Sequence, residues 1–117
     1  MSVKGLSILV LEDEPIIALT TEDLLIDAGA DPTTVSTIAD AEDALMARSF
    51  DLALLDVNVG QTNSYAVATA LKARGIRFIF ATGYGDALHG DAFAGVPTIT
   101  KPYDLADIES AFASIQD

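Results

Sequence analysis

The chain has 117 residues, half of them hydrophobic, which is enough for one ordinary domain with its own core. It has no cysteine, which excludes disulfides, thiolate chemistry and sulfur-ligated metal sites. A formal net charge of −12 argues against nucleic acid and anionic membranes as partners, and favours divalent cations and basic protein surfaces. No apolar segment is long enough to span a bilayer and no signal peptide follows Met1, so we expect a cytoplasmic protein.

Short apolar runs alternate with segments of helical periodicity along the chain. Leu6–Leu11 is continuously apolar and stops abruptly at acidic residues, which predicts a strand buried on both faces. Pro15 suits the first turn of a following helix, and Gly29 suits its end. The alternation continues, and it predicts strands over Thr33–Ser36, Leu52–Val57, Ile76–Ala81 and Thr98–Thr100, and helices over Ile38–Ser49, Ser64–Arg74 and Asp104–Ile115.

The predicted elements differ in the strength of their patterns. In the last helix Asp104 suits the N-cap, and the inward stripe consists of Leu105, Ile108, Phe112 and Ile115. The segment 83–95 is the weakest, because four glycines interrupt the expected fourth helix and each glycine inside a helix costs about 1 kcal/mol relative to alanine. We expect that helix to be short, frayed or mobile, and Gln61–Asn63 to be an ordinary polar loop.

Five apolar strands that alternate with helices indicate an α/β domain. Its parallel, doubly wound sheet would be covered by helices on both faces and joined by right-handed crossovers. No linker or repeat divides the chain, so we expect one domain over residues 1–117. In a flavodoxin-like three-layer sheet of order 2-1-3-4-5, ligands bind beyond the carboxyl ends of the strands, between strands 1 and 3.

Polar side chains stand at the ends of four of the five predicted strands. Glu12 and Asp13 follow strand 1, Asp56 ends strand 3, Thr82 ends strand 4 and Lys101 follows strand 5. Three converging carboxylates repel one another unless a cation intervenes. Carboxylate, carbonyl and water oxygens are the ligands that Mg²⁺ takes, so the pattern predicts a magnesium site.

The predicted magnesium ligands are Glu12, Asp13, Asp56 and the backbone carbonyl of Asn58. With the metal in place, the natural reaction is attack of the Asp56 carboxylate on a phosphoryl group, because carboxylates form aspartyl phosphates. The metal and the lysine would neutralise charge on the phosphoryl oxygens, and the threonine hydroxyl would donate a hydrogen bond to one of them. The catalytic set expected is therefore Asp56 as phosphoacceptor with Thr82 and Lys101.

Four motifs occur in a fixed order: Leu9–Pro15 with the acidic pair, Asp51–Asn58 with the acceptor aspartate, Thr82, and Lys101–Pro102. Together they resemble the response-regulator receiver family over essentially the full chain. The resemblance implies that Asp13 and Asp56 ligate Mg²⁺ directly, that Glu12 acts largely through bound water, and that Pro102 is a cis proline. It also implies that the phosphodonor is a phosphohistidine on a sensor histidine kinase or a histidine phosphotransferase.

One further motif, and one position at which this chain differs from most receivers, concern the signalling output. Residues 78–85 read Phe-Ile-Phe-Ala-Thr-Gly-Tyr-Gly, which looks like the signature of the "FAT GUY" subgroup of mostly single-domain receivers. Most receivers carry Tyr or Phe three residues before the lysine, whereas this chain has Thr98. The usual aromatic rotamer switch cannot operate there, so we hypothesise transmission through Thr82, Tyr84 and the glycine-rich segment 83–95.

The function expected is that of a phosphoacceptor receiver in a two-component or phosphorelay system. It would be a monomer that catalyses only its own phosphorylation and dephosphorylation, and it would regulate a protein partner or pass the phosphoryl group onward. The last helix ends close to Asp117, so an output domain is expected only if the chain is a fragment of a larger response regulator or hybrid kinase.

Three other classes of protein share parts of the pattern. A haloacid-dehalogenase-type phosphatase also combines Asp, Thr, Lys and Mg²⁺, but it carries its nucleophile on strand 1 in an Asp-x-Asp motif, where this chain has Glu12–Pro15. A flavodoxin-like FMN protein needs a hydroxyl- and glycine-rich phosphate loop after strand 1, where acids would repel the phosphate. A degenerate receiver would act only as a scaffold, but here all key positions are filled.

Overall fold

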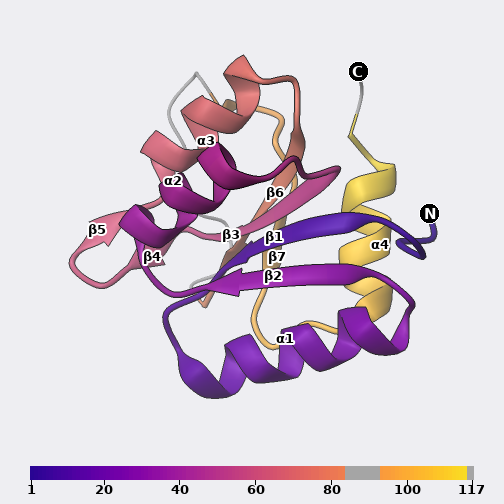
Figure 1. The fold of residues 1–117 in the computed structure, drawn as a ribbon. Coiled ribbons are helices and arrows are strands. Elements are labelled where there is room, and N and C mark those ends of the chain that lie inside the picture. The colour runs from indigo at the N-terminus through magenta and orange to yellow at the C-terminus, as the bar shows by residue number, and fades with distance from the viewer. Residues whose placement is uncertain (84–92, 116–117) are drawn as a thin grey trace.

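The middle layer of the molecule is a parallel sheet of five strands (Figure 1). The computed structural model describes residues 1–83 and 93–115. The sheet strands are β1 (Ser7–Leu11), β2 (Asp31–Val35), β3 (Leu52–Asp56), β6 (Arg77–Thr82) and β7 (Thr98–Thr100). Their spatial order is β2-β1-β3-β6-β7, which confirms the predicted order 2-1-3-4-5 counted over these five strands.

Four helices in the described residues form the outer layers of the molecule. They are α1 (Pro15–Asp27), α2 (Ile38–Ala47), α3 (Tyr65–Ala73) and α4 (Leu105–Ala113). Helices α2 and α3 pack against one face of the sheet, and α1 and α4 pack against the other (Figure 1). Within the described ranges, none of these helices has the length and apolar character needed to cross a membrane.

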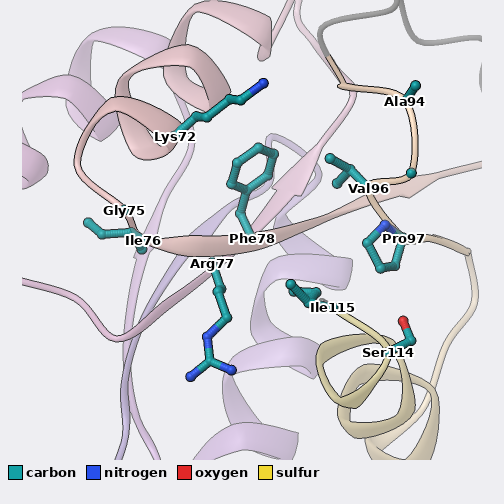
Figure 2. Close-up of a pocket in the computed structure, with 11 residues that line it drawn as sticks. Lys72, Gly75, Ile76, Arg77, Phe78, Ala94, Val96, Pro97, Ser114 and Ile115 are labelled. Carbon is teal, nitrogen blue, oxygen red and sulfur yellow. The ribbon is translucent and has the colours of Figure 1, made fainter. Parts of the chain in front are cut away.

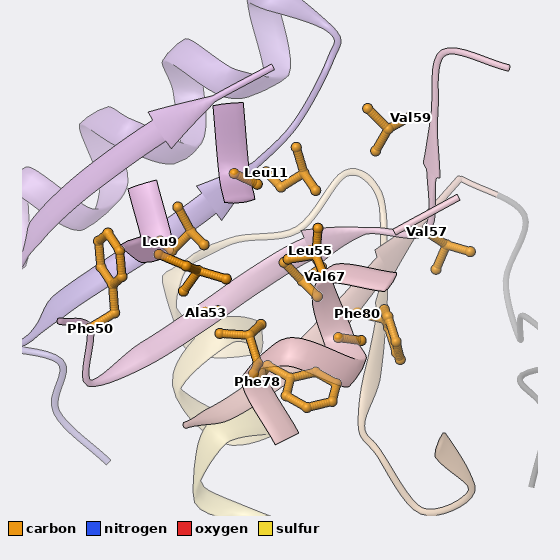
Figure 3. Packing of buried hydrophobic residues seen from close by; sticks show 14 of the residues in the cluster. Leu9, Leu11, Phe50, Ala53, Leu55, Val57, Val59, Val67, Phe78 and Phe80 are labelled. Carbon is orange, nitrogen blue, oxygen red and sulfur yellow. The ribbon is translucent and has the colours of Figure 1, made fainter. Parts of the chain in front are cut away.

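Alternate residues of each central strand enter different core clusters, because successive side chains of a strand point to opposite faces. The cluster beneath α2 and α3 includes Leu9, Leu11, Ala53, Leu55, Phe78 and Phe80 (Figure 3). The cluster beneath α1 and α4 includes Ile8, Val10, Leu52, Leu54, Ile79 and Ala81. Burial on both faces explains why these strands read as continuous apolar runs.

The helices begin where the local sequence can satisfy their first backbone N–H groups. Thr37 accepts a hydrogen bond from the backbone N–H of Asp40 at the start of α2. Asp104, the predicted N-cap of α4, accepts from the backbone N–H of Asp107 at 2.9 Å, and the Asp107 carboxylate accepts from the backbone N–H of Asp104 at 3.0 Å. This reciprocal capping box fixes the N-cap of α4, Asp104, three residues after Lys101.

The segments 61–63 and 83–95 were expected to form a polar loop and a fourth helix. The expected polar loop at Gln61–Asn63 is part of a small antiparallel hairpin, formed by β4 (Asn58–Val59) and β5 (Thr62–Asn63). Its tight turn contains Gly60 at φ +61°, and its Val59 side chain is buried in the core. The expected fourth helix over 83–95 lies mostly at 84–92, outside the described residues.

Candidate functional site

Parallel pairing brings the polar ends of the strands to one edge of the sheet. Leu11 of β1 pairs with Leu55 of β3, so the next residues along, Glu12 and Asp56, are neighbours. On the other side of β3, Thr82 ends β6, and its carbonyl accepts a hydrogen bond from the Lys101 backbone N–H at 2.8 Å. Sequence positions far apart therefore meet at the predicted switch point.

Three carboxylates and one ammonium group form the centre of the site. Glu12, Asp13 and Asp56 each place a carboxylate oxygen within 4.8 Å of the others. Glu12 is 2% exposed and Asp56 6% exposed, so both carboxylates lie largely out of water. The Lys101 Nζ lies 2.7 Å from Glu12 Oε1 and 3.0 Å from Asp56 Oδ2, and it bridges the two.

The pKa values of this group reflect burial and mutual charge. Burial raises the pKa of Asp56 to about 7, and the adjacent Glu12 acts in the same direction, while Lys101 opposes both. Burial by itself would lower the pKa of Lys101, but its hydrogen bonds to Glu12 and Asp56 outweigh this effect and raise it. The lysine therefore stays charged, and Asp56 titrates near neutral pH when the lysine is its only nearby cation.

Asp13 has a partner that the sequence did not reveal. Its Oδ2 accepts a hydrogen bond from the backbone N–H of Gly60 at 2.8 Å, and this bond lowers the pKa of Asp13. The turn of the β4–β5 hairpin thus reaches back to the acidic pair after β1. A glycine soon after the acceptor strand was the one available signal, but it does not identify which side chain the turn would contact.

Comparison with known proteins identifies the family. The family model described as "Response regulator receiver domain" matches residues 8–113. This chain belongs to the response regulator receiver family. A search of curated proteins found no match.

Solved structures of receivers resemble this chain over almost its whole length. SdrG from Sphingomonas melonis Fr1 is 40% identical, with a TM-score of 0.83 over 97% of this chain and 98% of that one. A structure described as the BeF3-activated conformation of SdrG from Pseudomonas melonis Fr1 is 38% identical, with a TM-score of 0.78 over 94% of this chain and 96% of that one. A CheY-like receiver domain from Methylobacillus flagellatus is 26% identical, with a TM-score of 0.81 over 97% and 100%.

Receivers are signalling domains of two-component systems rather than classical enzymes, and they bind Mg²⁺ at an acidic pocket. The residues of this chain fit such an ion. Glu12, Asp13 and Asp56 offer clustered oxygen donors of the hard kind that Mg²⁺ prefers. Asn58 begins β4 two residues after Asp56, and its carbonyl as a further ligand stays a prediction.

Other predicted features of the receiver lie around this centre. The Lys101–Pro102 peptide bond is cis, as the family resemblance implied. Thr98, where most receivers carry an aromatic residue, begins β7 and pairs with Phe80 of β6. The signal route that we hypothesised runs through Thr82, Tyr84 and the segment 83–95, and most of that segment, 84–92, lies outside the described residues.

One surface pocket lies next to the site, and a larger one lies at the other edge of the sheet. A pocket of about 380 Å³ adjoins it between α1 and the segment after β7, lined by Ile16, Ile17, Thr20, Thr21, Lys101, Pro102 and Tyr103. A larger pocket of about 790 Å³ lies at the opposite, amino-terminal edge of β6 and β7, between Lys72, Phe78, Val96 and Ile115 (Figure 2). None of the described residues that line the larger pocket has a carboxylate, so the chemistry belongs to the carboxyl edge.

Proposed function

We propose that this receiver accepts a phosphoryl group on Asp56 from a phosphohistidine donor, in a reaction that depends on Mg²⁺. The observation that carries the proposal is the position of the Lys101 ammonium, 2.7 Å from Glu12 and 3.0 Å from Asp56, beside a third carboxylate. This arrangement combines an acceptor oxygen with the positive charge that a transferring phosphoryl group needs. The BeF3-activated conformation of the SdrG relative supports the same chemistry here.

The transfer step forms one bond and breaks one bond. A carboxylate oxygen of Asp56 attacks phosphorus, the phosphorus–nitrogen bond breaks, and the imidazole nitrogen leaves with the bonding electron pair. Lys101 neutralises charge on a phosphoryl oxygen, and the Thr82 hydroxyl, at the end of the adjacent strand, donates a hydrogen bond to another. The product is an acyl phosphate on Asp56, and its later attack by water releases inorganic phosphate.

Mg²⁺ would be held by Asp13, Asp56 and the carbonyl of Asn58, with Glu12 acting through bound water. When bound, the ion supplies positive charge that keeps the carboxylates ionised and offsets the charge of the phosphoryl oxygens. The Gly60 hydrogen bond already holds one Asp13 oxygen in place on the loop side of the cluster. The Lys101 ammonium holds Glu12 and Asp56 in place through its two ion pairs.

The phosphodonor would be a sensor histidine kinase or a histidine phosphotransferase. Ile16 and Leu19 of α1 are 81% and 61% exposed, and Ile16 lines the pocket that adjoins Lys101. A donor protein could bury these side chains while it presents its phosphohistidine to the site. We further propose that the chain is a cytoplasmic monomer, with a single receiver domain over residues 1–117, that regulates a protein partner or passes the phosphoryl group onward.

The decisive experiment is phosphorylation of the purified chain by acetyl phosphate or by a phosphorylated histidine kinase. Intact-protein mass spectrometry, with and without Mg²⁺, should show one added phosphoryl group only when Mg²⁺ is present. Asp56→Asn should abolish the added mass. Asp43→Asn is the matched control, because Asp43 is an exposed acid of α2 away from the carboxylate cluster, and this variant should be labelled like the wild type. Labelling that persists in Asp56→Asn would defeat the proposal.

A further inference from the structure

A partly buried hydrogen bond links α1 to the segment that carries Lys101. The Tyr103 hydroxyl lies 2.7 Å from the Thr21 Oγ1, across 82 positions of sequence. Thr21 is 1% exposed in the middle of α1, and Tyr103 packs against the core cluster beneath α1 and α4. The Thr21 hydroxyl is thus removed from water, and the half-buried Tyr103 hydroxyl is its hydrogen-bond partner.

The Tyr103 side chain also lies close to the reacting groups. Burial raises the pKa of its phenol, and the charges of Glu12, Lys101 and Asp56 act on it as well. The phenol therefore stays protonated at neutral pH and remains able to form the bond with Thr21. None of the roles assigned above to the reacting carboxylates, to Thr82 or to Lys101 uses this pair.

The position of Lys101 needs more support than its own side chain provides. A lysine ammonium on a flexible four-carbon stem must be held within ion-pair distance of Glu12 and Asp56 together. On the β6 side, the Lys101 backbone N–H is fixed to the Thr82 carbonyl at 2.8 Å. On the α1 side, a pocket of about 380 Å³ lies between the helix and the Lys101 segment. Side-chain packing therefore does not by itself fix the Lys101 segment on this side.

We infer that Tyr103 and Thr21 are positioning residues for Lys101: their hydrogen bond crosses the gap on the α1 side and holds the lysine segment against the helix. The inference rests on the proposed function, because it assigns the pair a role in phosphoryl transfer to Asp56. The Thr21–Tyr103 bond thus connects α1 to the segment between β7 and α4, behind the reacting groups. The bond acts through Lys101 and does not touch the phosphoryl group.

The test uses variants of the full chain that each remove or replace one hydroxyl or methyl group. Tyr103→Phe and Thr21→Val should each lower the rate of phosphorylation by acetyl phosphate at saturating Mg²⁺ by about tenfold, since small displacements of a catalytic group have effects of this order. Thr21→Ser keeps the hydroxyl and should restore most of the rate. Thr69→Val is the matched control, because Thr69 is exposed on α3, its hydroxyl donates to the Tyr65 carbonyl within that helix, and its loss should not affect Lys101.

Two further measurements separate positioning from general stability and from the proposed function. In a Lys101→Met background, Tyr103→Phe should cost less than about twofold in rate, because the group through which it acts is gone. NMR of the Lys101 ammonium, without any phosphodonor, should show a shifted or broadened signal in Tyr103→Phe and an unchanged one in Thr69→Val. Wild-type rate with an unchanged ammonium signal in Tyr103→Phe would overturn the inference, as would a full tenfold loss in the Lys101→Met background. A changed ammonium signal in a chain whose Asp56 is never labelled would support the positioning role and refute only the proposed function.

Discussion

Replacing Asp56 by Asn should stabilise the metal-free protein at neutral and alkaline pH. The folded state raises the pKa of Asp56 from 3.8 to about 7, so it binds this proton more tightly than the unfolded chain does. The stability that this group contributes is complete below pH 3.8, falls as the pH rises, and is lost above about 7. At about 1.4 kcal/mol per pKa unit, this pKa shift changes the free energy of unfolding by about 4 kcal/mol between low and high pH. Asparagine also leaves Lys101 with one carboxylate instead of two, so we expect a net gain of about 2 to 4 kcal/mol at pH 8.

The assay is urea denaturation followed by far-UV circular dichroism, in EDTA, at intervals from pH 4 to pH 8. The free energies of unfolding of Asp56→Asn and of the wild type should converge near pH 4 and separate as the pH rises. Asp43→Asn removes one exposed negative charge and controls for the general repulsion of a chain with net charge −12. Adding Mg²⁺ at pH 8 should stabilise the wild type more than Asp56→Asn, because the variant has lost one proposed ligand.

A pH-independent difference between Asp56→Asn and the wild type would refute this reasoning. So would a metal-free Asp56→Asn variant that is less stable than the wild type at pH 8, since that would mean the carboxylate is net stabilising in its buried setting. Equal gains in Asp43→Asn and Asp56→Asn would assign the effect to overall charge. The same set of denaturation curves distinguishes these three outcomes from one another.

Three further changes test separate parts of the structure. Lys101→Met leaves Glu12 and Asp56 facing each other without a cation, and it should lower the free energy of unfolding of the metal-free protein by about 3 kcal/mol at pH 8, measured with urea. Asp104→Ala removes the capping box of α4 and should cost about 1 kcal/mol by thermal denaturation, most of which Asp104→Ser should restore. Gly60→Ala must adopt a φ of +61° and should cost about 1 kcal/mol in urea, although a methyl group there meets no atom within 4 Å; an unaffected stability would show that the turn relaxes.

The five strands and their order were predictable because burial on both faces leaves a strong local pattern. Leu52–Leu55, the part of β3 before Asp56, is buried on both faces and therefore wholly apolar, so it is recognisable in the sequence. The same logic predicted that Glu12, Asp13, Asp56, Thr82 and Lys101 meet, because parallel strands bring their carboxyl ends to one edge. The β4–β5 hairpin was missed because two-residue strands leave no periodicity.

The sequence by itself therefore determined which chemical groups gather at the site, since strand position alone decides that. Only the tertiary structure decided how those groups are held. The Lys101 ammonium bridges two carboxylates, the Gly60 amide holds Asp13 across 47 positions, and Tyr103 meets Thr21 across 82 positions. Such contacts depend on angles and distances between packed elements, to within a fraction of an ångström. No local pattern carries that information, because burial and hydrogen bonding are properties of the assembled layers.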